Sequence, residues 1–191
     1  MSDTSVSREV LAAARRLAER NALGDASMED IAREAGITRM TLYRRGETRA
    51  AIVEALRAEL AREERGRLLP ILTGPGDARE RLERVLRVVC EMTDARADLL
   101  SGLDAAALNA IYHEEGPGAL TRSEFIGPIV RLLKDGAVDG SLRKVANAEE
   151  AATVLYTQIS YTYLHLRREH RWSARRTTRA VKDLAFTGLL P

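Results

Sequence analysis

Apolar residues recur along this chain at steps of three and four, the spacing that places side chains on one face of an α-helix. Gly and Pro clusters at 73–76 and 115–118 separate these stretches, and β-branched runs are short. The pattern therefore predicts an all-α chain of about nine helices. The helices are expected at residues 10–20, 27–36, 38–45, 48–67, 77–96, 98–112, 121–135, 147–168 and 173–187.

Residues 27–49, with the sequence SMEDIAREAGITRMTLYRRGETR, predict two short helices joined by a tight turn. Ser27 and Asp30 have the spacing of a capping box at the start of the first helix. Gly36 supplies a left-handed residue that ends this helix, and Thr38 caps the second one. Two short helices in this arrangement, followed directly by a third, are typical of a helix-turn-helix.

The second short helix has an outward face that packing alone does not require. When Leu42 points inward, a turn of 100° per residue directs Met40 and Arg44 outward, with Tyr43 at their flank. Arg39 can reach the same side with its long stem. An exposed face is what a recognition helix needs to enter the major groove of DNA. Outward Arg and Tyr side chains also occur on ordinary surfaces, so the prediction depends on the combined spacing.

This segment resembles the DNA-binding domain of the TetR/AcrR-type bacterial transcriptional regulators. The resemblance rests on the run Thr38–Tyr43 followed by Arg45, Thr48 and Arg49, and it covers about the first sixty residues. Beyond that point only the helical layout and the length agree. The resemblance implies an N-terminal three-helix DNA-binding domain at residues 1–48. It also implies a helical ligand-binding and dimerisation domain at residues 49–191.

The resemblance further implies a role for each matching residue. Side chains that would approach base edges are Arg39, Met40 and Tyr43. Side chains that would hold phosphates are Ser27, Thr41, Arg44, Arg45, Thr48 and Arg49. Thr38 would cap the recognition helix and lie near the DNA backbone. An arginine at position 39 would prefer guanine, because its fork matches the O6 and N7 acceptors, whereas Met40 offers apolar contact.

The chain departs from the family pattern at two places. Gly46 stands where the family usually has an aromatic residue, so we expect a looser or differently shaped junction before the fourth helix. Arg49 and Ala50 stand where the family has Lys and Glu. Arg49 would meet a phosphate by a forked contact instead of a point charge.

The charge distribution suits a DNA partner that is contacted locally. The net charge of the 191 residues is only +2, so the chain is no general coater of nucleic acid. Residues 37–49 nevertheless hold four Arg against one Glu. A single cysteine, Cys90, excludes an intramolecular disulfide and sits in the apolar run Val88–Cys90. It is interpreted as a buried small side chain, with a redox sensor as the alternative.

The chain carries neither a signal-peptide pattern nor an apolar stretch long enough for a membrane span, so a cytoplasmic location is expected. No metal or cofactor site is expected either. His165 and His170 are five residues apart and diverge on a helix, and His113 stands at a loop edge. A phosphate-binding glycine motif and a nucleophile with a positioned base are missing from the sequence, so the chain is not expected to be an enzyme.

The last two expected helices predict assembly. The helix at 147–168 is apolar nearly all round, which suggests packing on two sides. Small and apolar residues recur on the final helix at Ala174, Thr177, Thr178, Val181, Leu184, Ala185 and Gly188. The resemblance implies that these two helices pair with the same two of a second subunit. An internal seam in a monomer is the alternative.

The middle helices are expected to enclose an effector pocket, as the resemblance implies. Candidate lining residues are Met92, Tyr112, Phe125, Tyr156, Gln158 and Tyr161, each of which also fits a plain core position. The predicted function is a DNA-binding transcriptional regulator, namely a homodimeric repressor of a palindromic operator that a small-molecule effector releases. The alternatives are an activator of the same architecture, and a helical interaction module or enzyme-like bundle with a vestigial helix-turn-helix.

Overall fold

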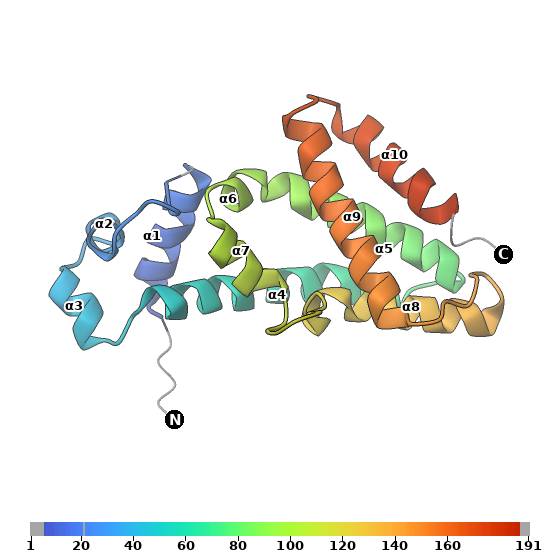
Figure 1. The fold of residues 1–191 in the computed structure, drawn as a ribbon, viewed down its shortest axis with the longest axis horizontal. Helices are drawn as coiled ribbons and strands as arrows, with labels where there is room; N and C mark the ends of the chain where they lie inside the picture. The colour runs from blue at the N-terminus through green and yellow to red at the C-terminus, as the bar shows by residue number, and fades with distance from the viewer. Residues whose placement is uncertain (1–5, 21, 188–191) are drawn as a thin grey trace. The chain divides into compact units, whose positions relative to one another are not determined.

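The computed structural model describes residues 6–20 and 22–187 (Figure 1). These residues form ten α-helices and contain no β-strand, which confirms the all-α prediction. In chain order the helices are α1 (Arg8–Glu19), α2 (Met28–Glu34), α3 (Arg39–Arg44), α4 (Arg49–Leu72), α5 (Ala78–Ala95), α6 (Ala97–Ser101), α7 (Ala105–Tyr112), α8 (Ser123–Asp139), α9 (Ala148–Arg168) and α10 (Ala174–Thr187).

The additional helix arises because the single helix expected at 98–112 is divided at Gly102. A Cβ atom at Gly102 would lie 1.9 Å from the carbonyl oxygen of Ala18, so this position accepts only glycine. Asp104 then starts a new helix, since its side chain accepts a hydrogen bond from the Ala107 N–H. The division therefore follows from a close approach to α1, which local sequence periodicity does not report.

Two helices contain a proline and extend further than the ranges expected from the sequence. α4 continues through Pro70 and ends two residues later at Leu72, and α8 continues through Pro128. A proline inside a helix removes one backbone donor and crowds the carbonyl four residues before it, which is unfavourable, yet both helices continue past their prolines. α8 also passes the expected end at Gly136 and stops at Gly140, whose φ is +78°. Leu142 occupies the space beside Gly136, where an added Cβ would lie 2.6 Å from Cδ1.

Contacts divide the chain into two compact units. The first combines residues 1–60 with residues 96–115, and the second combines residues 61–95 with residues 116–191. The first unit thus holds α1, α2, α3, α6, α7 and the first half of α4. The functional boundary expected after residue 48 concerns DNA binding and regulation, and it stays a prediction.

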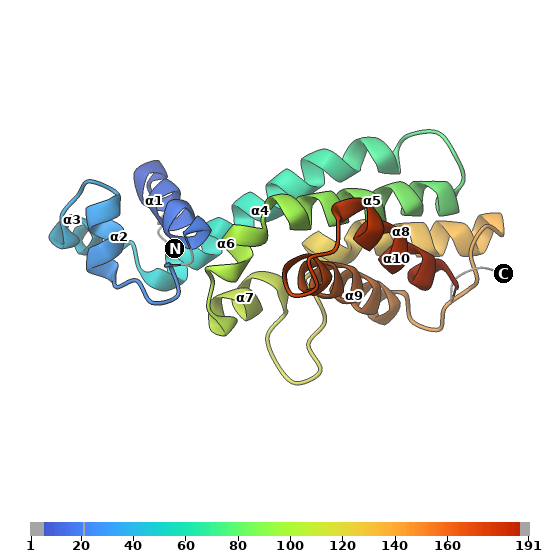
Figure 2. The same cartoon turned by 90° about the horizontal axis from the view of Figure 1, so that it is seen from above.

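In the first unit, α1 is the central helix. It packs against both α2 and α6, and α2 packs against α3 (Figure 2). The buried apolar side chains of α1 recur at steps of three and four, as the pattern predicted. Ile31 on α2, Leu42 on α3, and Ile52 and Leu56 on α4 are each at most 1% exposed. This core fixes which side of α3 remains outside.

In the second unit, α9 is the central helix and contacts α5, α8 and α10. This arrangement explains why α9 is apolar on more than one side. Its buried residues include Leu155, Ile159 and Tyr163, while Val154 on the same helix is 62% exposed. Gly188, which was expected to extend the apolar stripe of the last helix, lies outside the described residues. None of the described helices combines the length and the apolar character that a bilayer span requires.

Candidate nucleic-acid interface

Both ends of α2 are formed as the sequence predicts. The Ser27 hydroxyl accepts a hydrogen bond from the Asp30 N–H at 3.1 Å, and the Asp30 carboxylate accepts one from the Ser27 N–H at 2.9 Å. Gly36 has a φ of +71°, and the Ile37 N–H donates to the Ala32 carbonyl at 3.0 Å. This is a Schellman ending, in which a left-handed glycine lets the chain turn directly into the next helix.

The same ending closes α3, with Gly46 in the place of Gly36. Gly46 has a φ of +70°, its N–H donates to the Tyr43 carbonyl, and the Glu47 N–H donates to the Leu42 carbonyl. The residue that was expected to loosen the junction thus gives it a defined hydrogen-bonded turn. A glycine ending thus stands where the family pattern has an aromatic residue.

The outward face of α3 carries the three side chains that were predicted to approach bases. Met40 is 73% exposed and Tyr43 is 57% exposed, whereas Leu42 is buried at 1%. The Arg39 guanidinium donates to the Tyr43 hydroxyl at 2.9 Å and lies 5.2 Å from the ring centroid. The structure therefore brings Arg39 and Tyr43 together on an exposed face.

Three of the hydroxyl residues of the predicted interface serve as helix caps, namely Ser27, Thr38 and Thr48. The Thr38 side chain accepts a hydrogen bond from the Thr41 N–H at 3.2 Å, and the two hydroxyls lie 2.9 Å apart. Thr48 caps α4 by accepting from the Ala51 N–H at 3.2 Å. Together with Ser27, these side chains fix where the three helices begin.

Two neighbouring arginines at the end of α3 differ in their partners. The Arg45 guanidinium donates to the Glu9 carboxylate at 2.7 Å, and this bond lowers the pKa of the Glu9 carboxyl below its ordinary value of 4.5. Arg44 is exposed, and within the described residues it has no hydrogen-bond or ion-pair partner. Arg44 is therefore the more available charge for an external anion.

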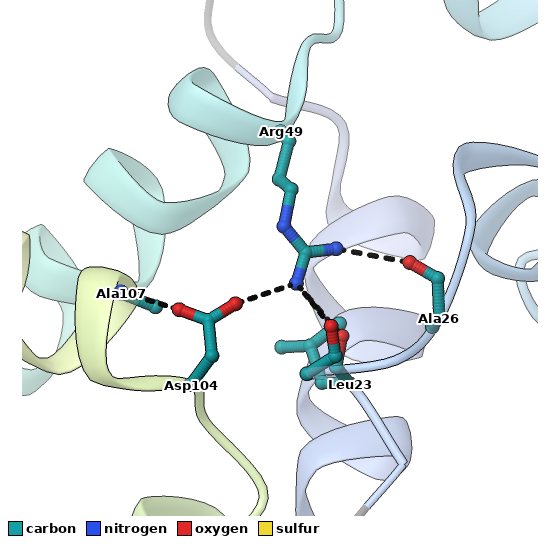
Figure 3. Close-up of polar contacts among 6 residues, drawn as sticks. Leu23, Ala26, Arg49, Asp104 and Ala107 are labelled. Atoms are coloured by element: carbon teal, nitrogen blue, oxygen red, sulfur yellow. Dashed lines mark hydrogen bonds and ion pairs between the residues drawn. The ribbon is translucent and has the colours of Figure 1, made fainter.

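Arg49, which was predicted to hold a phosphate, has its guanidinium engaged within the first unit (Figure 3). Nη1 donates to the Ala26 carbonyl at 3.0 Å, and Nη2 donates to the Leu23 and Gly24 carbonyls at 2.9 and 3.1 Å. Nη2 also lies 3.2 Å from Oδ2 of Asp104. Sequence reasoning missed Asp104, although an aspartate before a run of three alanines is a signal for a helix cap.

Glu47 is a second residue that sequence reasoning missed. Its side chain is buried at 3% exposure, and it accepts a hydrogen bond from the Ser7 N–H at 2.7 Å. Ser7 precedes α1, so the carboxylate lies at the positive end of that helix. The turn after α3 is thereby attached to the start of α1.

The candidate effector residues do not form one group. Met92, Phe125 and Tyr156 are buried in the second unit, where the Phe125 and Tyr156 rings lie 6.0 Å apart. Tyr161 is 49% exposed, and Tyr112 belongs to the first unit. Gln158 is half-buried on α9. An open groove of about 510 Å³ lies elsewhere in the second unit, between α5, Tyr163 and the charged side chains of α10.

Cys90 is fully buried, as expected for a small core side chain. Burial raises the pKa of its thiol to about 12. A thiol of this kind carries almost no thiolate at neutral pH, which argues against a redox-sensing role in the folded chain. In the described residues, no group of three or more His, Cys, Asp or Glu side chains is placed to hold a metal ion.

Comparison with known proteins adds a family match and a set of shared folds. Residues 10–56 match the family described as bacterial regulatory proteins, tetR family. No curated protein sequence matches the chain. A solved protein from Clostridium perfringens, described as a candidate fatty acid metabolism regulator, is 15% identical with a TM-score of 0.71, and 96% of this chain and 100% of that chain are covered.

Two further solved structures have the same fold. A TetR transcriptional regulator from Streptomyces coelicolor is 23% identical with a TM-score of 0.54, covering 96% of this chain and 97% of that chain. A gamma-butyrolactone receptor is 16% identical with a TM-score of 0.67, covering 96% of this chain and 87% of that chain. At such identities the likeness establishes the fold alone.

The family match spans most of α1, all of α2 and α3, and the start of α4. These are the helices whose caps, glycine endings and exposed face are described above. Residues 10–56 therefore match the tetR family of bacterial regulatory proteins, and the chain as a whole has the fold of a TetR-type DNA-binding transcriptional regulator.

Proposed function

We propose that this chain is a homodimeric repressor that binds a palindromic operator and leaves it when a small-molecule effector binds. The observation that carries the proposal is the exposed face of α3. Met40 and Tyr43 lie outside although both have apolar bodies, and Arg39 is held beside Tyr43. A helix with such a face, fixed at both ends, is suited to the major groove.

The side chains of α3 would contact different groups of the bases. Arg39 would donate its fork to guanine O6 and N7, and Met40 would contact a thymine methyl group. The hydrogen bond between Arg39 and Tyr43 restricts both side chains before DNA arrives, which reduces the entropy cost of binding. Base preference would thus depend on a side-chain pair.

Phosphate contacts would hold this helix in register. Arg44 is exposed and offers an unpaired charge, and Arg45 can exchange its surface ion pair with Glu9 for a phosphate at little cost. The hydroxyls of Ser27, Thr41 and Thr48 lie at the starts of their helices, where they can reach the DNA backbone.

A dimer through α9 and α10 would complete a two-fold binding site. Val154 and Tyr161 are seven residues apart on one face of α9 and are 62% and 49% exposed. Leu184 on α10, which packs beside α9, is 66% exposed. An internal seam in a monomer would have buried these side chains, whereas a second copy would cover them.

Effector binding would belong to the second unit. The buried aromatic pair of Phe125 and Tyr156 is the part of the candidate set that could line a cavity for an organic ligand. The relative described as a gamma-butyrolactone receptor supports a small organic molecule as the class of effector. Release would require the effector to favour a non-binding state by about 1–3 kcal/mol.

Selection from a pool of randomised DNA duplexes tests the proposal. We expect the wild-type protein to enrich a palindrome whose half-sites lie about one helical turn apart, with two chains bound per duplex. The affinity should fall steeply as salt rises. The double variant Val154→Asp with Leu184→Asp should be monomeric and should bind the same duplex weakly. A pool that is not enriched, or one chain bound to an asymmetric site, would contradict the proposal.

A further inference from the structure

Arg49 and Asp104 are connected more extensively than a surface ion pair requires. The four contacts of Arg49 use both terminal guanidinium nitrogens, which form the fork that an arginine would offer to a phosphate. Asp104 is held in turn, because its other oxygen accepts a hydrogen bond from the Ala107 N–H at 2.7 Å. Both side chains are therefore fixed by backbone groups as well as by each other.

The position of these contacts in the helix-turn-helix gives them a role. Residues 23–26 form the loop that enters α2, and Arg49 is the first residue of the helix that follows α3 (Figure 3). The guanidinium thus connects the loop before α2 to the start of the helix that follows α3. The same loop is also tied to the turn between α6 and α7, because the Gly24 N–H donates to the Gly102 carbonyl at 2.9 Å.

We propose that Arg49 is a positioning residue of the DNA-binding helices, with Asp104 as its partner, and that it is not a phosphate ligand. This inference rests on the proposed DNA binding. Arg49 sets the angle at which α3 is presented by holding the loop before α2 against the start of α4. A phosphate that bound the same two terminal nitrogens would have to displace three carbonyls and a carboxylate from them.

Salt dependence separates positioning from phosphate binding. Each phosphate contact contributes about 0.9 to the slope of the logarithm of the binding constant against the logarithm of salt concentration. The probe is the duplex that the wild-type protein selects from a randomised pool, titrated between about 50 and 200 mM KCl. Arg49→Gln should weaken binding about tenfold and leave the slope unchanged, since the loss of charge-assisted internal bonds is not a loss of counterion release.

Arg44→Gln is the matched variant for a phosphate contact. It removes the same charge from the same unit, and it should lower the slope by about 0.9. Arg49→Lys should behave like Arg49→Gln, because an ammonium group cannot reproduce the fork. If Arg49→Gln lowers the slope as Arg44→Gln does and Arg49→Lys restores it, Arg49 is a phosphate ligand and the proposal is wrong.

Asp104 supplies a second test with an opposite sign. Removing a negative charge from a DNA-binding protein should strengthen binding by charge alone. Asp25→Asn, in the same loop and exposed, should follow that rule. Asp104→Asn should instead weaken binding, and adding it to Arg49→Gln should cause no further loss. Stronger binding of Asp104→Asn, equal to that of Asp25→Asn, would overturn the proposal.

Amide exchange in the absence of DNA keeps this inference distinct from the proposed function. The amides of Gly24 and Ala26 are hydrogen-bonded in the loop that Arg49 holds. Both should exchange faster in Arg49→Gln and Asp104→Asn than in the wild type and in Asp25→Asn. Unchanged exchange overturns the positioning role. If the two variants exchange faster but the wild-type protein selects no duplex, the positioning role of Arg49 is supported and the proposed DNA binding is contradicted.

Discussion

Glu47 accepts a hydrogen bond from the Ser7 N–H at 2.7 Å, so the turn that ends the recognition helix is attached to the start of α1. The residues are 40 positions apart in the sequence. A buried carboxylate at a helix N-terminus stabilises backbone donors that have no partner within the helix. Orientation of α3 therefore depends on contacts outside the helix-turn-helix pattern itself.

Glu47→Ala should lower the free energy of unfolding by about 1–2 kcal/mol, because it removes a charge-assisted cap from α1. Urea denaturation of the variant and the wild type measures this difference. Glu115→Ala removes an exposed carboxylate from a loop and serves as the control, with little expected change. Equal stability of the Glu47 and Glu115 variants would show that the contact contributes nothing.

Gly46 and Gly66 should respond in opposite ways to alanine. Gly46 has a φ of +70°, so Gly46→Ala should destabilise the protein by about 1 kcal/mol. Gly66 lies inside α4 with no atom near an added Cβ, so Gly66→Ala should stabilise it by about 0.5–1 kcal/mol. The midpoints of urea unfolding for the two variants check both signs. Shifts in the same direction would contradict the assigned role of Gly46.

The capping box of α2 should make stability depend on pH. Hydrogen bonds from the Ser27 hydroxyl and N–H lower the pKa of the Asp30 carboxyl below its ordinary value of 3.8. A carboxyl whose pKa is lower in the folded state than in the unfolded state stabilises the fold at pH values above its unfolded pKa. This contribution is lost as the pH falls through the folded pKa. The stability difference between the wild type and Asp30→Asn should therefore be full at neutral pH and vanish in acid. A difference that is independent of pH would rule out this contribution.

Cys90 should be inert to thiol reagents in the folded protein. Its thiol is buried, so a reagent in solution cannot reach it, and its pKa of about 12 leaves almost no thiolate at neutral pH. A chromogenic disulfide reagent should label the cysteine only after denaturant is added. Rapid labelling of the native protein would restore the redox-sensor alternative.

Local signals in the sequence predicted the caps and glycine endings of the helix-turn-helix. Ser27, Thr38 and Gly36 act through hydrogen bonds to residues three to five positions away, so their spacing is visible in the sequence. Leu42 was recognisable as a core residue for the same reason. The helical fold and its main loops could be predicted on this basis.

Tertiary contacts could not be predicted in this way. The helix break at Gly102 depends on the carbonyl of Ala18, and the state of Arg49 depends on Asp104, which is 55 residues away. At position 46, a glycine in place of an aromatic residue suggested a loss of packing. The left-handed backbone that Gly46 adopts could not be inferred from its residue type alone. The expected effector residues are likewise assigned to two compact units, since Tyr112 belongs to the first unit and Phe125 and Tyr156 belong to the second.

Binding of Arg39→Ala to the duplex that the wild-type protein selects is the most direct test of the central claim. The matched control is Arg143→Ala, which removes the same charge from an exposed position of the second unit. We predict that Arg39→Ala costs about 1–3 kcal/mol of binding free energy and relaxes the preference at one base pair of each half-site, while the control binds as the wild type does. Equal affinity and unchanged base preference for Arg39→Ala would contradict recognition of DNA by the exposed face of α3.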